Sequence, residues 1–315
     1  MRSRLALTAR HRLRLDLALP RIFRLKPAKF KYIAPNSSEE VVSHLASYNG
    51  EARCLSGGQS LLPLMNFRLI RPEALIDLNR CPGLDYLRRD DGQLVIGPMT
   101  TQSTVEYSDL VKTCCPLITK TMIYLGSPTI RNRGTIGGTL AHADRTAELP
   151  AVAVALEAEL IAQSPMGIRR IAADDFFRGD LSTDLRTDEM LLEIRFPVSP
   201  AGSLSAFTEA TNRHHDLALA GVAVHLELAE GGLVANARIV CNGIAPAPVR
   251  LKRVEETLCG TRADDDAVRD AVQFSLEGIE PEGDIHASAD YRSAALPRLV
   301  ARVLQQAVAD GARLQ

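Results

Sequence analysis

Two pairs of adjacent glycines carry the clearest chemical signal in this sequence. One lies in Ser56-Gly57-Gly58-Gln59-Ser60-Leu61 and the other in Thr135-Ile136-Gly137-Gly138-Thr139. Glycine permits a positive φ angle and lets the backbone approach a ligand closely. Successive N–H groups in such a turn bind anions, and the hydroxyls of Ser60 and Thr139 can add a donor each. We therefore predict two phosphate loops that close on one diphosphate from two sides.

Acids and histidines near the second glycine pair leave several interpretations open. Asp144 and Glu148 could form a catalytic carboxylate pair, but a helix-capping acid followed by a first-turn acid is equally ordinary. His142 and the His214-His215 pair suggest a metal or acid–base site. Because no third ligand lies within sequence reach, hydrogen-bonding or surface histidines are favoured. Neither glycine pair belongs to a G-x-G-x-x-G or Walker A motif, so these residues indicate only two candidate phosphate loops.

The elements around the first pair alternate between strands and helices. We expect strands at 30–33, 52–55 and 74–78, with helices at 37–48 and 61–69 between them. Ser37 and Glu40 are spaced as a capping box at the start of the first helix. This order predicts a small α/β unit.

The second pair lies in a longer region with a different pattern. We expect strands at 93–97 and 190–196, helical segments within 104–125, a helix with Pro150 in its first turn, and a hairpin at 160–171. Residues 198–205 have linker composition. Beyond them, alternation at 222–228 and 235–241 predicts an antiparallel hairpin, and residues 296–308 place apolar side chains on one face of a helix.

Composition narrows the class of protein. The chain has 315 residues, 46% hydrophobic and 24% charged, with no Trp, which is ordinary for a soluble globular protein of two or three domains. Its six cysteines are unclustered, which argues against zinc or an iron–sulfur cluster bound within this chain and fits a reducing compartment. No apolar run approaches the roughly 20 residues that span a bilayer.

Charge is concentrated at the amino terminus. Residues 1–26 hold eight Lys and Arg and a single acid, Asp16, which gives this segment a charge of +7. Because the whole chain has a net charge of −1, the remaining residues carry −8. This composition resembles a transit peptide. The favoured alternative is a disordered extension or an upstream start codon chosen in error.

Several separated motifs, in order, resemble the flavoprotein (medium) subunit of the molybdenum hydroxylases, the family of xanthine dehydrogenase and aerobic carbon monoxide dehydrogenase. The motifs are Ser56-Gly57-Gly58-Gln59-Ser60-Leu61-Leu62-Pro63-Leu64-Met65, Ile130-Arg131-Asn132-Arg133-Gly134-Thr135-Ile136-Gly137-Gly138, Ala141-His142-Ala143-Asp144 with Glu148-Leu149-Pro150-Ala151, and Asp284-Ile285-His286-Ala287-Ser288-Ala289-Asp290-Tyr291-Arg292. The resemblance runs from about Pro27 to the end. Ser56 and Arg145 depart from it, since alanine and proline are common there.

The resemblance implies that both glycine pairs hold the pyrophosphate of FAD. It places Glu148, with Asp144 as a second candidate, near the ribityl or ribose hydroxyls. Leu125 and Leu217 are expected beside the flavin and Leu191 on the adenine side, although all three leucines could be core residues. The implied cofactor contacts are Ser56, Gly57, Gly58, Gln59, Ser60, Leu61, Leu125, Thr135, Ile136, Gly137, Gly138, Thr139, Asp144, Glu148, Leu191 and Leu217.

The fold implied is α+β, of the PCMH-type FAD-binding class. We expect a basic extension at 1–26, an α/β FAD-binding unit at 27–84, a middle α+β domain at 85–200 that completes the FAD cleft, and a C-terminal domain of antiparallel sheet and helices at 201–315.

The function implied is electron transfer without a catalytic side chain in this chain. A large molybdenum-cofactor subunit oxidises the substrate, a small subunit relays electrons through iron–sulfur clusters to FAD, and an external acceptor, NAD or a quinone, receives them. We expect a cytoplasmic dimer of heterotrimers that binds no nucleic acid. Two alternatives remain: a free-standing FAD-dependent oxidoreductase, or a non-catalytic assembly subunit. The substrate stays open.

Overall fold

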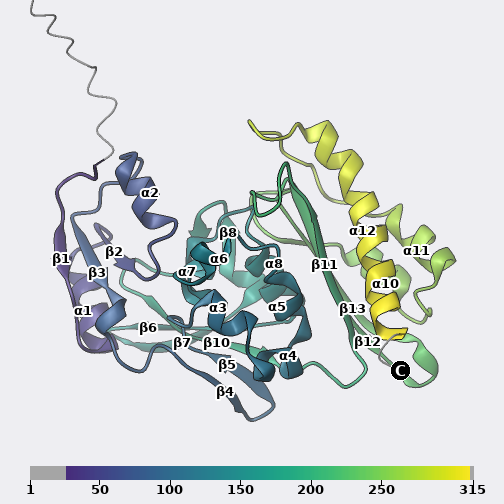
Figure 1. The fold of residues 1–315 in the computed structure, drawn as a ribbon, viewed down its shortest axis with the longest axis horizontal. Coiled ribbons are helices and arrows are strands. Elements are labelled where there is room, and N and C mark those ends of the chain that lie inside the picture. Colours follow the sequence, from purple (N-terminus) through teal and green to yellow (C-terminus); the bar gives the residue numbers. More distant parts are fainter. Residues whose placement is uncertain (1–25, 313–315) are drawn as a thin grey trace, which may run out of the picture.

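The computed structural model describes residues 26–312, which form three successive units, each built on its own sheet (Figure 1). The predicted basic extension lies outside the described residues apart from Lys26. Among the residues described, no helix is both long and apolar enough to cross a membrane.

The first unit is a three-stranded parallel sheet. Strands β1 (Lys31–Ile33), β2 (Ala52–Leu55) and β3 (Ala74–Asp77) have the order β1-β3-β2. Helix α1 (Ser38–Ser47) covers it through Val41, Val42 and Leu45, and Ser37 caps the helix by accepting from the Glu40 amide at 3.2 Å. The predicted order of elements is confirmed. Helix α2 (Leu61–Asn66) is shorter than expected, because Arg68 adopts a left-handed φ of 60°, and the short 3₁₀ helix η2 (Leu78–Arg80) follows β3.

The second unit is a five-stranded antiparallel sheet with helices on one face. Its order is β4 (Leu87–Asp90), β5 (Gln93–Ile96), β10 (Met190–Pro197), β6 (Glu159–Ser164) and β7 (Gly167–Ala172). The hairpin of β6 and β7 was predicted, whereas β4 was not, because Leu-Arg-Arg-Asp has no apolar alternation. The helices are α3 (Gln102–Glu106), α4 (Asp109–Cys114), α5 (Pro116–Thr121), α6 (Pro128–Arg131), α7 (Ile136–His142), α8 (Glu148–Ala155) and α9 (Ala173–Phe176).

A short ribbon joins the last helix of this unit to β10. Strands β8 (Phe177–Gly179) and β9 (Ser182–Thr183) pair with each other, and residues 184–189 then return the chain to the sheet. This 178–189 segment was not predicted as a structural element, and it becomes important at the functional site.

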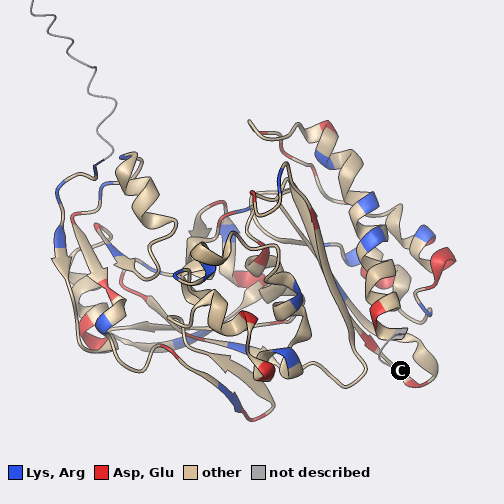
Figure 2. Cartoon of the chain, viewed as in Figure 1, with Lys and Arg blue, Asp and Glu red and all other residues tan. Residues whose placement is uncertain are grey.

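The third unit is a four-stranded antiparallel sheet of β11 (Leu204–Ala210), β12 (Ala220–Leu228), β13 (Val234–Asn242) and β14 (Val249–Arg250). The predicted hairpin is β12 and β13, joined through the 3₁₀ helix η3 (Glu230–Gly232). The start of β11 overlaps the predicted linker. Helices α10 (Lys252–Leu258), α11 (Asp265–Val272) and α12 (Ala289–Ala312) cover one face. Asp264 caps α11, whose first turn is acidic (Figure 2).

Helix α8 joins the second and third units. All eight of its residues are buried, and Phe207, Ala223 and Val240 of the third sheet belong to the same apolar core as the α8 residues Val152 and Ala155. Alternation along β12 predicted one apolar face, but both faces are buried, because α12 packs on one side and α8 on the other. The two units therefore share a core.

Candidate cofactor-binding site

The two glycine segments meet directly. The Ser56 Oγ lies 2.6 Å from the Thr135 Oγ1, although the two residues are 79 positions apart. A Cβ at Gly57 would overlap the Arg133 carbonyl oxygen, so only glycine lets the first segment lie this close to the residues before the second. The predicted convergence of the two segments is present in the structure.

The second segment is not the loop that we expected. Gly137 and Gly138 lie in the first turn of α7, and Thr135 caps this helix by accepting from the Gly138 amide at 3.0 Å. The Gly137 amide donates to the Pro98 carbonyl at 3.0 Å, and a Cβ at Gly137 would lie 2.6 Å from that same oxygen. Gly137 is therefore required by packing within the protein, and its amide is already satisfied.

The first segment keeps its backbone donors available. Among the described residues, none of the amides of residues 57–61 donates to a protein acceptor. Gly58 has a φ of +72°, a conformation that other residues adopt only with strain, and this turn precedes α2. A row of such amides suits the oxygens of a phosphate group. The two segments thus have different roles. The first presents backbone amides to the cleft, and the second presents the hydroxyls of Thr135 and Thr139 close to it.

Both segments line one cleft of about 620 Å³ between the first and second units. The predicted residues that line it are Ser56, Gly57, Gly58, Gln59, Ser60, Leu61, Thr135, Gly137, Gly138, Thr139 and Leu191. The lining also includes residues that sequence reasoning missed, among them Arg53, Gln102, Thr183, Arg186 and Thr187. Gln102 Nε2 donates to the Thr139 Oγ1 at 2.8 Å, a contact between α3 and α7 that no local pattern signals.

Five predicted contacts do not line this cleft. Leu125 and Ile136 are buried in the core of the second unit, which for Leu125 is the core alternative. Glu148 lies in the first turn of α8, as the capping alternative expected, but Asp144 does not cap this helix: its N-cap is Ala147, and Asp144 accepts from the Thr146 amide at 2.8 Å in the preceding turn. Leu217 is half-exposed between β11 and β12.

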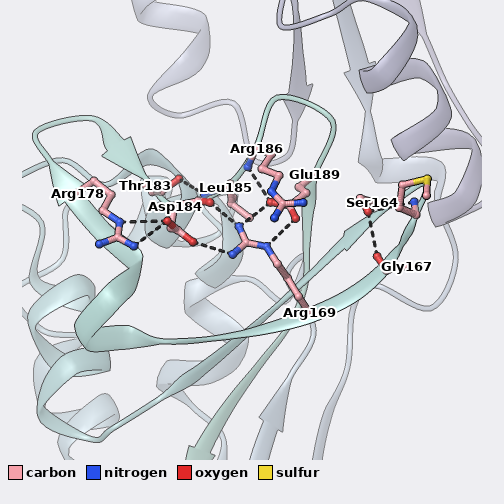
Figure 3. Close-up of polar contacts among 10 residues, drawn as sticks. Ser164, Gly167, Arg169, Arg178, Thr183, Asp184, Leu185, Arg186 and Glu189 are labelled. Atoms are coloured by element: carbon pink, nitrogen blue, oxygen red, sulfur yellow. Dashed lines mark hydrogen bonds and ion pairs between the residues drawn. The ribbon is translucent and has the colours of Figure 1, made fainter.

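Arg169 on β7 fixes the 178–189 segment, which lines the cleft opposite the two glycine segments (Figure 3). Arg169 binds both carboxylate oxygens of Glu189, at 2.7 and 2.8 Å, and also the Asp184 carboxylate at 2.7 Å. Arg178 binds the other oxygen of Asp184 at 2.8 Å. These contacts fasten the 178–189 segment to the sheet (Figure 3). Thr183 and Arg186 of this segment line the cleft.

The Glu189 carboxylate is buried and yet charged. Burial alone raises the pKa of Glu189, but the hydrogen bonds from the Arg169 guanidinium and the Arg186 amide outweigh this effect, and the pKa lies below its usual value. A buried carboxylate that is bound on both oxygens gives a rigid anchor.

The histidines and cysteines form no metal cluster in the part of the chain that the structure describes. The rings of His214 and His215 lie 3.8 Å apart, and His142 lines the cleft. Cys54 also lines the cleft, and burial raises the pKa of its thiol to about 12, so it is an unreactive neutral group.

Comparison with known proteins identifies the family. Residues 28–199 match the model of the FAD binding domain in molybdopterin dehydrogenase, and residues 205–307 match the CO dehydrogenase flavoprotein C-terminal domain. The chain is 36% identical to the 6-hydroxypseudooxynicotine dehydrogenase complex subunit alpha of Paenarthrobacter nicotinovorans, covering 90% of this chain and 96% of that one. It is also 36% identical to the carbon monoxide dehydrogenase medium chain of Hydrogenophaga pseudoflava, covering 89% and 98%.

Solved structures agree with these matches. Carbon monoxide dehydrogenase from Hydrogenophaga pseudoflava superposes with a TM-score of 0.87 at 37% identity, covering 90% of this chain and 98% of that one. Quinoline 2-oxidoreductase from Pseudomonas putida 86 superposes with a TM-score of 0.86 at 35% identity, covering 91% of this chain and 99% of that one. The chain belongs to the family of FAD-binding medium subunits of the molybdenum hydroxylases, and it is an FAD-containing oxidoreductase subunit.

Proposed function

We propose that this chain is the electron-transfer subunit of a multi-subunit molybdenum hydroxylase, which receives electrons from the iron–sulfur clusters of a partner and passes them to NAD or a quinone. The observation that carries the proposal is the meeting of residues 56–61 and 135–139 in one cleft. Bound FAD supplies the redox chemistry, while the protein binds, orients and shields it.

The residues of the cleft fit the diphosphate of FAD. The available amides of residues 57–61 would donate to its oxygens, and the Ser60 hydroxyl would add a donor. A Cβ at Gly138 would lie 2.8 Å from the Thr135 Oγ1, so glycine at this position leaves room for the Thr135 hydroxyl, which meets Ser56 in the cleft. Leu191 and the 178–189 segment would line the adenosine end.

The remaining cofactor contacts rest on the family resemblance. Leu125, Ile136, Asp144, Glu148 and Leu217 lie outside the lining of the diphosphate cleft. We retain them as proposed contacts of the ribityl chain and the flavin, which must extend beyond the diphosphate.

The partners follow from the names of the relatives. These relatives are a complex subunit and medium chains, so this chain assembles with large and small subunits. We propose that these carry the molybdenum cofactor and the iron–sulfur clusters, in a cytoplasmic dimer of heterotrimers. The six unclustered cysteines of this chain are consistent with clusters that reside in another subunit.

Co-expression with the proposed large and small partner subunits tests this function. We expect a complex that contains flavin, iron and molybdenum, and a separately purified chain with flavin absorbance. A purified chain that binds no FAD would support an assembly role instead. Substrate oxidation by the isolated chain would support a free-standing oxidoreductase.

A further inference from the structure

A side chain from the neighbouring strand end holds the first glycine segment. Strands β2 and β3 are parallel, and Leu55 pairs with Asp77 at their carboxyl ends, so the residues that follow both strands lie at the same edge of the sheet. Ser56 follows β2, and Asn79 lies in η2, directly after β3. The Asn79 Nδ2 donates to the Ser56 carbonyl oxygen at 3.1 Å. The first carbonyl of the segment is therefore bound by a residue that lies outside it.

The hydrogen bonds of Asn79 fix the orientation of its side-chain amide. Its Nδ2 also donates to the Asp77 Oδ1 at 2.6 Å, so both N–H bonds of this nitrogen point at acceptors. A reversed amide would place the Asn79 oxygen against a carbonyl oxygen and a carboxylate oxygen. The Asn79 backbone amide donates to the same Asp77 oxygen at 3.0 Å. Asp77 thus holds Asn79 through both its side chain and its backbone.

Asp77 is a buried anion that accepts hydrogen bonds on both oxygens. It is 7% exposed, and the Tyr32 hydroxyl of β1 donates to its Oδ2. Burial raises the pKa of Asp77, but the hydrogen bonds from Tyr32 and Asn79 outweigh this effect, and the pKa lies below its usual value. Asn79 itself is exposed, so its hydrogen bonds compete with water. The buried carboxylate is what keeps it in place.

The bound carbonyl determines where the next amide points. In a planar trans peptide group, the C=O and the N–H point in opposite directions. The Ser56 carbonyl accepts from Asn79, so the Gly57 amide of the same peptide group points away from Asn79. This amide has no protein acceptor among the described residues, and Gly57 lines the cleft. The next carbonyl, that of Gly57, accepts from the Gln59 Nε2 at 2.9 Å and is bound in the same way.

We propose that Asn79 is a positioning residue for FAD, which orients the Ser56–Gly57 peptide group so that the Gly57 amide donates to an oxygen of the diphosphate. Asp77 acts one step further away, by holding Asn79. The hydrogen bond between the Ser56 and Thr135 hydroxyls fixes the Ser56 side chain, whereas Asn79 fixes its peptide group. This role deepens the proposed function, because it takes residues 57–61 as the diphosphate contacts.

The wild type, Asn79→Ala and the control Asp264→Ala test this role. Asp264 caps α11 in the third unit by accepting from the Ala267 amide at 3.0 Å, so its loss destabilises the fold away from the cleft. Asn79→Ala should bind FAD about tenfold more weakly, because the Ser56–Gly57 peptide group can then rotate. It should also shift the phosphorus NMR signals of the bound diphosphate. The control should melt at a lower temperature with unchanged FAD affinity and phosphorus signals.

An exchange of the two side chains separates positioning from folding. Asn79→Asp places a second carboxylate against that of Asp77 and should lower the melting temperature. Asp77→Asn, added to it, restores a donor and an acceptor between the two positions, so the melting temperature should recover. FAD binding should stay about tenfold weaker, since the residue at position 79 still offers no side-chain donor to the Ser56 carbonyl. Recovery of FAD affinity together with stability would overturn the positioning role.

Two further results distinguish this role from the proposed function. A wild-type chain that binds no FAD would count against both. Wild-type affinity and wild-type phosphorus signals in Asn79→Ala would contradict the role of Asn79 and leave the proposed function intact.

Discussion

The hydroxyls of Ser56 and Thr135 form a 2.6 Å hydrogen bond that joins the first and second units within the lining of the FAD cleft. Ser56 follows β2, and Thr135 caps α7. The bond therefore connects the turn that offers free amides to the helix that closes the opposite side.

A double-mutant cycle on this pair should show coupling. We expect Ser56→Ala to cost about 1 kcal/mol of unfolding free energy through the lost hydrogen bond. Thr135→Ala should cost about 2 kcal/mol, because it also removes the α7 cap. The double variant should cost about 1 kcal/mol less than the sum, as measured by denaturant unfolding. Additive losses would show that the hydroxyls do not interact.

Gly58→Ala should weaken FAD retention more than an equivalent change elsewhere. Gly58 has a φ of +72°, and a Cβ there would lie 3.0 Å from the Leu62 Cδ1. Gly83 has a φ of +77° with open space around it, so Gly83→Ala is a control with the same backbone strain of about 1 kcal/mol. Flavin absorbance per chain after gel filtration measures the difference. Equal retention in both variants would contradict the role of the first turn.

Arg169→Ala should destabilise the protein by about 3 kcal/mol, because it leaves Glu189 buried and unpaired. FAD should also be lost, since the 178–189 segment is no longer fastened to β7. The neighbouring Arg170 forms an exposed 3.4 Å pair with Glu159, and Arg170→Ala should cost less than about 0.5 kcal/mol. Thermal unfolding and flavin content test both variants. Arg169→Lys, which keeps the charge, serves if the alanine variant does not fold.

The Arg169 network should make the protein sensitive to acid. The pKa values of Glu189 and Asp184 lie below their usual range, for Asp184 because Arg169 and Arg178 donate to it. Stability from a depressed pKa is present above the unfolded value of about 4 and is lost as the pH falls through the folded value. The melting temperatures of the wild type and Arg169→Ala should therefore converge as the pH falls from about 6 to about 3. A constant difference would assign the effect of Arg169 to packing.

Removal of residues 1–25 should leave flavin content and thermal unfolding unchanged. The deletion keeps Lys26, whose carbonyl oxygen accepts from the Arg68 Nε at 3.1 Å. Both glycine segments and the cleft lie within the remaining chain. A truncated chain that misfolds or loses FAD would show that the basic segment has a structural role.

Local patterns in the sequence were sufficient for several elements. The Ser37 cap, the β6–β7 hairpin, the β12–β13 hairpin and the apolar face of α12 were all read from spacing, since each depends on residues close in the chain. Strand β4 was not predicted because Leu-Arg-Arg-Asp has no apolar alternation, although it pairs with its chain neighbour β5. Strand β11 was not predicted because it begins in residues of linker composition, and it becomes a strand by pairing with β12.

The sequence by itself determined which residues could hold a diphosphate, because glycine at Gly58 and Gly138 is a local chemical property that needs no partner to be recognised. Only the tertiary structure decided which of the two segments can donate backbone amides to a ligand. It made the second segment a capped helix with satisfied amides, and it left the amides of residues 57–61 without a protein acceptor in the described part of the chain. It also brought the Ser56 hydroxyl onto the Thr135 hydroxyl and the Arg169 guanidinium onto the Glu189 carboxylate. These contacts join residues far apart in the chain, and their energies depend on burial, which no local pattern specifies.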